Sequence, residues 1–187
     1  MAQSGLLIEH RDNQMRFAHP VFGGFLAGRA LSNYNVDERL TGQTFWSGKT
    51  LSMPYLAATG DVSSLVETLL GTPDPILKRN LILMGEWLRD APRKSAWRGK
   101  VLTPLAKTLQ DDTQPLRLRG QIVASLAKSE DPSVAALFRQ LLQSKSAYVL
   151  QLAALGSGLM QDKKATQILA NIFQIVQNTF TLTAVCL

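Results

Sequence analysis

The residues that could do chemistry are few in this chain of 187 residues. Its two histidines are His10 and His19, and its one cysteine is Cys186. A two-histidine metal site needs a third ligand, which Glu9 or Asp12 would have to supply. Exposed histidines on neighbouring strands explain the same spacing without a metal, so we expect no metal site. Cys186 has no nearby base to activate it, and we interpret it as a packing residue.

A second candidate motif is Gly48-Lys49-Thr50, the ending of a phosphate-binding P-loop. A P-loop has four residues between its glycines and lies at a strand-to-helix turn. Here five residues separate Gly42 from Gly48, and no strand is predicted before them. We therefore expect no ATP binding by this segment. We predict instead the first helix of a repeat, with Phe45 and Trp46 packed inward.

Adjacent carboxylates are the last candidates for catalysis. Asp111-Asp112 and Glu130-Asp131 both fall in predicted turns, where carboxylates cap helices better than they exchange protons. The three tryptophans, Trp46, Trp87 and Trp97, fall in predicted helices and are expected in the core. The sequence therefore predicts a chain that is not an enzyme and has no catalytic residue or cofactor of its own.

The elements that would position these groups form an internal repeat. Apolar residues at i, i+3, i+4, i+7 and i+8 give residues 134–142 one apolar helical face. The pattern returns 31 residues later over 165–173, and 36 and 72 residues earlier over 98–106 and 62–70. In the 98–106 copy, charged Arg98 takes the place of Val134. Further helices over 75–89, with Leu77, Leu81, Met84 and Leu88 on the inner face, and over 115–128 alternate with these.

The repeated unit is a helix, a turn with an aspartate, a second helix and a short loop. Asp131 and Asp162 should cap the second helices of two such units. This unit resembles the HEAT repeat family over about residues 42–176. The resemblance implies an all-α fold, a right-handed superhelix (α-solenoid) of about three to four helix pairs within residues 42–187. Such stacks bind proteins or peptides on an extended surface.

Residues 1–41 differ from the repeats. Two short apolar segments on either side of residues 11–14 predict a β-hairpin. A helix should follow over 21–31, with Phe22, Phe25, Leu26 and Ala30 on one face and Pro20 in its first turn. Gly23 and Gly24 should weaken this helix.

This N-terminal stretch is similar to the end of the winged-helix region of NACHT-type STAND NTPases. The similarity rests on Gly5-Leu6-Leu7, on residues 17–22 (Phe-Ala-His-Pro-Val-Phe) and on residues 25–31. The sequence departs from the family at Gly23-Gly24 and at Gly28. The resemblance implies that His19 senses the phosphates of ADP or ATP held by a longer parent protein. The alternative is that His19 is a partly buried hairpin residue whose ring satisfies a local backbone group.

Charge is unevenly distributed along the chain. The net charge is +6, and residues 78–119 carry ten Lys and Arg against four Asp and Glu. A basic stripe of this kind can bind phosphate backbones or acidic partners, whereas the simpler interpretation is a solvated helical face. The candidate basic interaction surface consists of Lys78, Arg79, Arg93, Lys94, Arg98, Lys100, Arg117 and Arg119.

These observations favour a non-catalytic sensor or interaction module of a STAND-like signalling ATPase, in the cytoplasm and without a membrane anchor. Its partner would be a protein, a peptide or another domain of its own polypeptide. A free-standing HEAT-repeat adaptor is the first alternative, and a HEAT-like nucleic-acid-binding protein or bilin lyase is the second. Because no polar capping repeat is visible at the C-terminus, we expect the chain to be a piece of a longer protein or to depend on further packing at this end.

Overall fold

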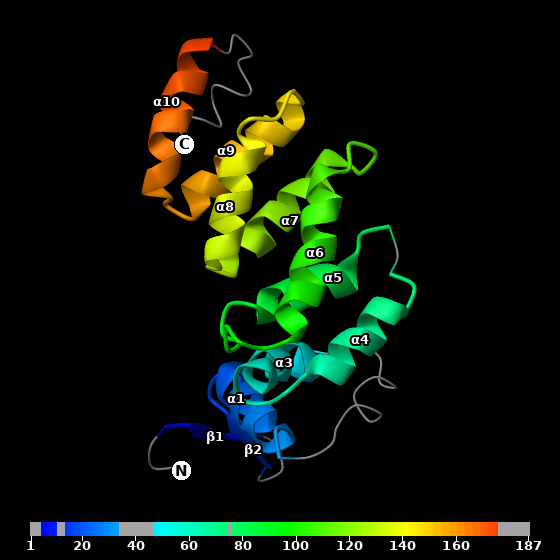
Figure 1. Cartoon of the computed structure of the whole chain (residues 1–187). Coiled ribbons are helices and arrows are strands. Elements are labelled where there is room, and N and C mark those ends of the chain that lie inside the picture. Colours follow the sequence, from blue (N-terminus) through cyan, green and yellow to red (C-terminus); the bar gives the residue numbers. More distant parts are fainter. Residues whose placement is uncertain (1–4, 11–13, 34–46, 75, 176–187) are drawn as a thin grey trace. The chain divides into compact units, whose positions relative to one another are not determined.

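The computed structural model describes residues 5–10, 14–33, 47–74 and 76–175. The chain is mostly helical, with a small two-stranded sheet at the N-terminus (Figure 1). It forms two compact units: unit 1 holds Met1–Gly71 and Asp90–Ser95, and unit 2 holds Thr72–Arg89 and Ala96–Leu187. The mostly helical class is as predicted. The first boundary between the units follows Gly71, so the first predicted repeat helices belong to the same unit as the N-terminal elements.

Unit 1 begins with the predicted hairpin. Strands β1 (Leu7–His10) and β2 (Gln14–Phe17) pair antiparallel, with Leu7 opposite Phe17 and His10 opposite Gln14. Helix α1 (Pro20–Leu31) follows after two residues and has its proline in the first turn, where the missing N–H costs nothing. The hairpin and the helix are therefore confirmed.

Helices α1 and α3 (Ser47–Thr59) pack through glycine. A Cβ atom on Gly28 would lie 2.6 Å from the Ser52 carbonyl oxygen, and one on Gly24 would lie 2.8 Å from that of Leu51. The two backbones can approach this closely only because these residues have no side chain. Beside the glycines, the rings of Phe25 and Tyr55 meet edge to face with centroids 5.5 Å apart.

This packing corrects the predicted face of α1. Phe22, Phe25 and Leu26 are between 40% and 45% exposed, and Ala30 is also exposed, whereas Gly24 and Gly28 are buried. Gly24, which was expected only to weaken the helix, therefore forms its buried side together with Gly28. Phe45 and Trp46, predicted to pack inward, lie outside the described residues.

Unit 1 is completed by α4 (Ser63–Gly71), which buries Leu65 and Val66. Pro54 lies inside α3. Residues 48–50 lie in the first turn of α3, and Lys49 is buried. Burial lowers the pKa of the Lys49 ammonium.

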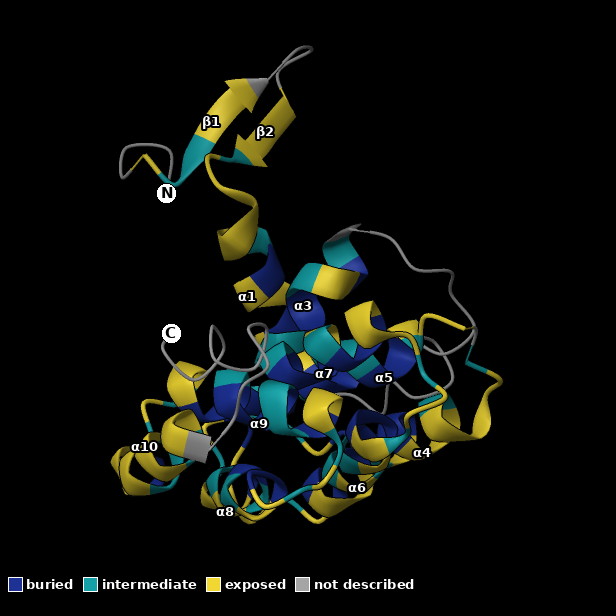
Figure 2. Cartoon of the chain, turned by 90° about the horizontal axis from the view of Figure 1, so that it is seen from above, coloured by how far each residue is buried: buried dark blue, intermediate teal, exposed yellow. Residues whose placement is uncertain are grey.

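Unit 2 contains two layers of helices (Figure 2). One layer holds α5 (Arg79–Trp87), α7 (Leu116–Lys128) and α9 (Ala147–Leu159), and α7 packs against both of its neighbours. The other layer holds α6 (Trp97–Gln110), α8 (Pro132–Leu141) and α10 (Thr166–Ile175), which follows the short helix η3 (Lys163–Ala165). Helix α6 packs against α5 and α7, and α8 packs against α9.

The core of unit 2 follows the predicted repeat. Val134, Phe138 and Leu141 of α8 are buried, and Leu105 of α6, which lies 36 residues before Leu141, is buried as well. Trp87 and Trp97 are buried as expected, whereas Trp46 lies outside the described residues. The aromatic ring of Phe138 fills the space beside Gly156, where a Cβ atom would lie 2.6 Å from the ring atom Cε1.

The start of α5 differs from the prediction. Leu77, assigned to the inner face of a helix beginning near residue 75, precedes α5 and is 69% exposed. Lys78 has a left-handed backbone with φ of 45°, so the right-handed helix begins only after this residue. The carboxylate of Asp74 then accepts hydrogen bonds from the backbone N–H groups of Asn80 and Leu81.

Two turns of unit 2 are copies of each other. Glu130 and Gln161 both have left-handed backbones, with φ of 49° and 52°, and each is followed by an aspartate. Asp131 and Asp162 accept hydrogen bonds from the backbone N–H groups two residues later, at 3.0 and 3.1 Å. The predicted N-caps are confirmed, and the preceding left-handed residue is an added element of the repeat.

Candidate functional site

The predicted basic surface contains two residues that are not on the surface. Arg98 is 4% exposed and Arg119 is 2% exposed. The prediction that they belong to an exposed interaction surface is therefore wrong. A cation buried in this way has to be paired, because its desolvation is otherwise costly.

Arg98 joins three helices of unit 2. It donates one hydrogen bond to the Leu88 carbonyl at the end of α5 and another to Asp131 Oδ2 at 2.9 Å. Burial raises the pKa of Asp131, but the hydrogen bonds from Arg98 and Ser133 outweigh burial, so this pKa lies below its ordinary value. The charged residue at the Val134-equivalent position therefore ties α6 to the end of α5 and to the cap of α8.

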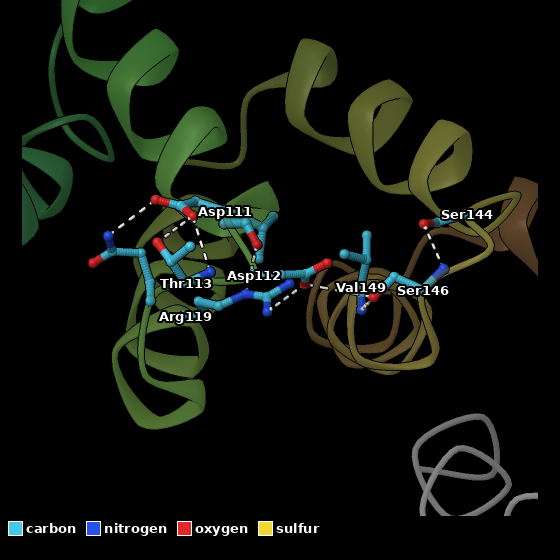
Figure 3. A network of polar contacts seen from close by, with 9 residues as sticks. Asp111, Asp112, Thr113, Arg119, Ser144, Ser146 and Val149 are labelled. Atoms are coloured by element: carbon cyan, nitrogen blue, oxygen red, sulfur yellow. Dashed lines mark hydrogen bonds and ion pairs between the residues drawn. The ribbon is translucent and has the colours of Figure 1, made fainter.

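Arg119 makes the corresponding contacts at the next helix along the chain (Figure 3). Its Nε atom donates to the Leu109 carbonyl at 2.8 Å, and Nη1 donates to Asp112 Oδ1 at 2.8 Å. The same Asp112 oxygen lies 3.5 Å from the hydroxyl of Ser146, which caps α9. Both buried arginines thus bind the carbonyl of the residue ten positions earlier, at the negative end of the preceding helix.

The other predicted basic residues are placed as follows. Arg93 and Lys94 are exposed in unit 1, whereas Arg79, Lys100 and Arg117 are exposed in unit 2 and Lys78 is half-buried there. Of the four residues in unit 2, Lys100 is on α6, and the other three lie at the starts of α5 and α7.

The net charge belongs to unit 2. Unit 2 contains thirteen Lys and Arg against seven Asp and Glu, whereas unit 1 contains seven of each. Four aspartates of unit 2 accept backbone hydrogen bonds in turns or at helix starts, and a fifth, Asp112, binds Arg119. The hydroxyl of Thr113, together with Gln114, lowers the pKa of Asp111 in this way. Most acidic side chains of unit 2 thus serve its fold.

Helices α5, α7 and α9 run parallel. The Ser125 hydroxyl of α7 donates to the Ile82 carbonyl near the middle of α5, and Lys128 lies 3.9 Å from Glu86 near the ends of the two helices. Asp112 meets Ser146 just before α7 and α9 begin. The turns that precede these three helices therefore lie along one side of unit 2 (Figure 1).

We call this side the N-terminal edge. It carries basic side chains and, between them, large apolar side chains that face solvent. Its basic members are Lys78, Arg79, Arg117 and Lys145. Its apolar members are Ile76, Leu77, Leu116 and Tyr148, with exposures of 82%, 69%, 45% and 59%. Large apolar residues gathered with cations at one edge indicate an interaction surface.

The opposite end of the same layer holds a pocket of about 620 Å³. The ends of α7 and α9 form it together with Arg89, and its floor includes Ala124 and Ala127. Its lining carries charges of both signs, from Arg89, Lys128 and Glu130.

His19 is the N-cap of α1. The backbone N–H of Val21 donates to its Nδ1 atom at 3.2 Å, which places the proton of a neutral ring on Nε2. The ring thus satisfies a local backbone group, as the alternative predicted. The side chain is, however, exposed and follows the hairpin, and is not partly buried within it. The side chain of His10 and all of Cys186 lie outside the described region of the chain.

Sequence reasoning missed the N-terminal edge as a unit. Leu77 fitted the apolar period of a longer helix, so its exposure could not be foreseen. A cation stands next to or near a large apolar residue at two helix starts, in Leu116-Arg117 and in the segment from Lys145 to Tyr148. This pairing is the sequence signal from which the edge could have been predicted.

Comparison with known proteins does not place the chain in a family. No family model, curated protein or solved structure matches it. Among the described helices, none has the length and apolar character needed to cross a bilayer.

Proposed function

We propose that this chain is a non-catalytic interaction module that binds a protein or peptide through a HEAT-like α-solenoid. The observation that carries the proposal is the two-layer arrangement of unit 2, whose turns before α8 and η3 repeat the same left-handed residue and capping aspartate. Repeats of this kind contact their neighbours and leave long helical surfaces for partners. A right-handed superhelix is the arrangement we propose for them.

The use of polar groups supports a binding role over a catalytic one. General acid–base work needs carboxylates whose protons can be exchanged near neutral pH. Among the described residues of unit 2, the aspartates accept hydrogen bonds from backbone and arginine groups, and the resolved pKa shifts are downward. Such carboxylates stay ionised and structural.

The proposed context is the sensor region of a STAND-like signalling ATPase in the cytoplasm. The hairpin, His19 and α1 occupy the stretch that resembles the end of the winged-helix region in that family. The His19 Nδ1 atom is used by the α1 cap, so a contact with ADP or ATP in a longer parent protein would fall to Nε2. A free-standing adaptor would use the same surfaces without this switch.

Cross-linking in an extract of the source cells tests the proposal. An antibody against residues 115–175 would recover the native product, and lysine cross-links from unit 2 would be mapped by mass spectrometry. We expect cross-links to one stoichiometric protein or to other domains of the same polypeptide. A native mass well above 20.5 kDa with an upstream P-loop supports the STAND context, and a mass near 20.5 kDa supports the adaptor. Absence of any protein cross-link would refute the binding role.

A further inference from the structure

We propose that the N-terminal edge of unit 2 binds an acidic protein segment that also carries aliphatic or aromatic side chains. This inference rests on the proposed function and specifies the chemistry of the partner and the place where it binds. The edge consists of Ile76 to Arg79, Leu116-Arg117, Lys145 and Tyr148, contributed by the starts of three parallel helices.

Charge selects an acidic partner. Arg117 and Lys145 are exposed, and the two aspartates of the turn before α7 are committed to the fold, since Asp111 caps its own turn and Asp112 binds Arg119. Asp74, before α5, is likewise held by backbone N–H groups. The helix dipoles of α5, α7 and α9 also present their positive ends here. The positive potential of these groups would mainly raise the rate at which an acidic partner associates.

The apolar side chains select a protein segment over a nucleic acid. Ile76, Leu77 and Leu116 are aliphatic and cannot stack on bases, and Tyr148 is the one aromatic residue of the edge. Covering aliphatic side chains of this size removes apolar area from water, which stabilises a complex by about 25 cal/mol per Å². Leu, Ile or Phe side chains placed between Asp and Glu residues would match the alternation of the edge.

The test selects ligands without assuming their sequence. A phage-displayed library of random peptides is panned on the full chain, and the tightest peptides are synthesised with a fluorescent label. Binding is measured by anisotropy at two salt concentrations. We expect the selected peptides to combine Asp or Glu with Leu, Ile or Phe. Arg117→Glu/Lys145→Glu and Leu77→Ser/Leu116→Ser should each weaken binding roughly tenfold, as removal of central contacts does.

Lys163→Glu/Lys164→Glu is the matched control. It reverses two exposed charges of the same unit at η3, in the other layer, and should leave binding unchanged. Circular dichroism of each variant confirms that it folds.

The outcomes separate this inference from the proposed function. Peptides that bind equally well to the edge variants would overturn the inference and leave the interaction role standing. No selected peptide, together with no cross-linked partner, would overturn both. Tighter binding of a labelled single-stranded oligonucleotide or of anionic vesicles, with the same dependence on Arg117 and Lys145, would replace the protein segment by that ligand.

Discussion

The Arg98 guanidinium donates a hydrogen bond to the Asp131 carboxylate across 33 residues, and that carboxylate also caps α8. One ion pair therefore fixes where α6, α8 and the end of α5 meet. The side chains are 5% and 17% exposed, so solvent screens the pair little.

Arg98→Met should destabilise the chain by about 3 kcal/mol, because it leaves Asp131 and the Leu88 carbonyl without their buried partner. Urea unfolding followed by circular dichroism measures this change. The double variant Arg98→Met/Asp131→Asn should lose less stability than the sum of the losses of the two single variants, because it leaves no unpaired charge buried. Additive costs would show that the two side chains act independently.

Stability should fall with acidification below about pH 4. The pKa values of Asp61, Asp111 and Asp131 are lower in the folded chain than in the unfolded one. Their contribution is thus complete above the unfolded pKa and is lost as the pH falls through the folded pKa. Thermal unfolding from pH 7 to pH 2.5 measures the slope. Asp131→Asn keeps the cap and should reduce the slope, and an unchanged slope would argue against a role for this carboxylate.

Gly28→Ala should loosen the contact between α1 and α3. The added Cβ atom would lie 2.6 Å from both the Ser52 carbonyl oxygen and the Tyr55 Cβ atom. We expect a loss of about 1–3 kcal/mol, as for overpacked cores. Faster hydrogen exchange of the α1 and α3 amides would report it. Gly120→Ala is the control: it faces open space on α7 and should stabilise its helix by up to about 1 kcal/mol.

Gly156→Ala tests the packing of α8 on α9. The Phe138 ring is fully buried and lies where the new methyl group would go. A cost of about 1–3 kcal/mol is expected from the displaced ring. Phe138→Leu in the same chain should recover some of it, because the smaller side chain leaves room for the methyl group. Thermal unfolding of the single and double variants provides the comparison, and no recovery would place the strain elsewhere.

His19→Ala should cost up to about 1 kcal/mol by removing the cap of α1, and His19→Asn should restore most of the loss. Hydrogen exchange at Val21 and Phe22 measures the local effect. If His19→Asn were as destabilising as His19→Ala, the ring would have a role beyond capping, and ADP binding by a longer parent protein would be the next measurement.

The sequence predicts those regions of the fold that depend on local periodicity. The faces of α6, α7 and α8 and the caps at Asp131 and Asp162 follow from apolar spacing and turn chemistry. The buried side of α1 does not follow from apolar spacing. The apolar side chains lie on the opposite face of the helix, and Gly24 and Gly28 contact α3. Arg98 and Arg119 were assigned to the surface by their charge. Their burial depends on carbonyl and carboxylate groups supplied by other helices, which no local pattern reveals.

The paired turns at Glu130-Asp131 and Gln161-Asp162 have a consequence for how such a chain can change in length. The segment from Asp131 to Gln161 starts with a capping aspartate and ends with a left-handed residue. A second copy inserted after Gln161 would recreate the same backbone junction at both of its ends. Gene duplication could therefore lengthen this array one helix pair at a time, without requiring a new turn to evolve.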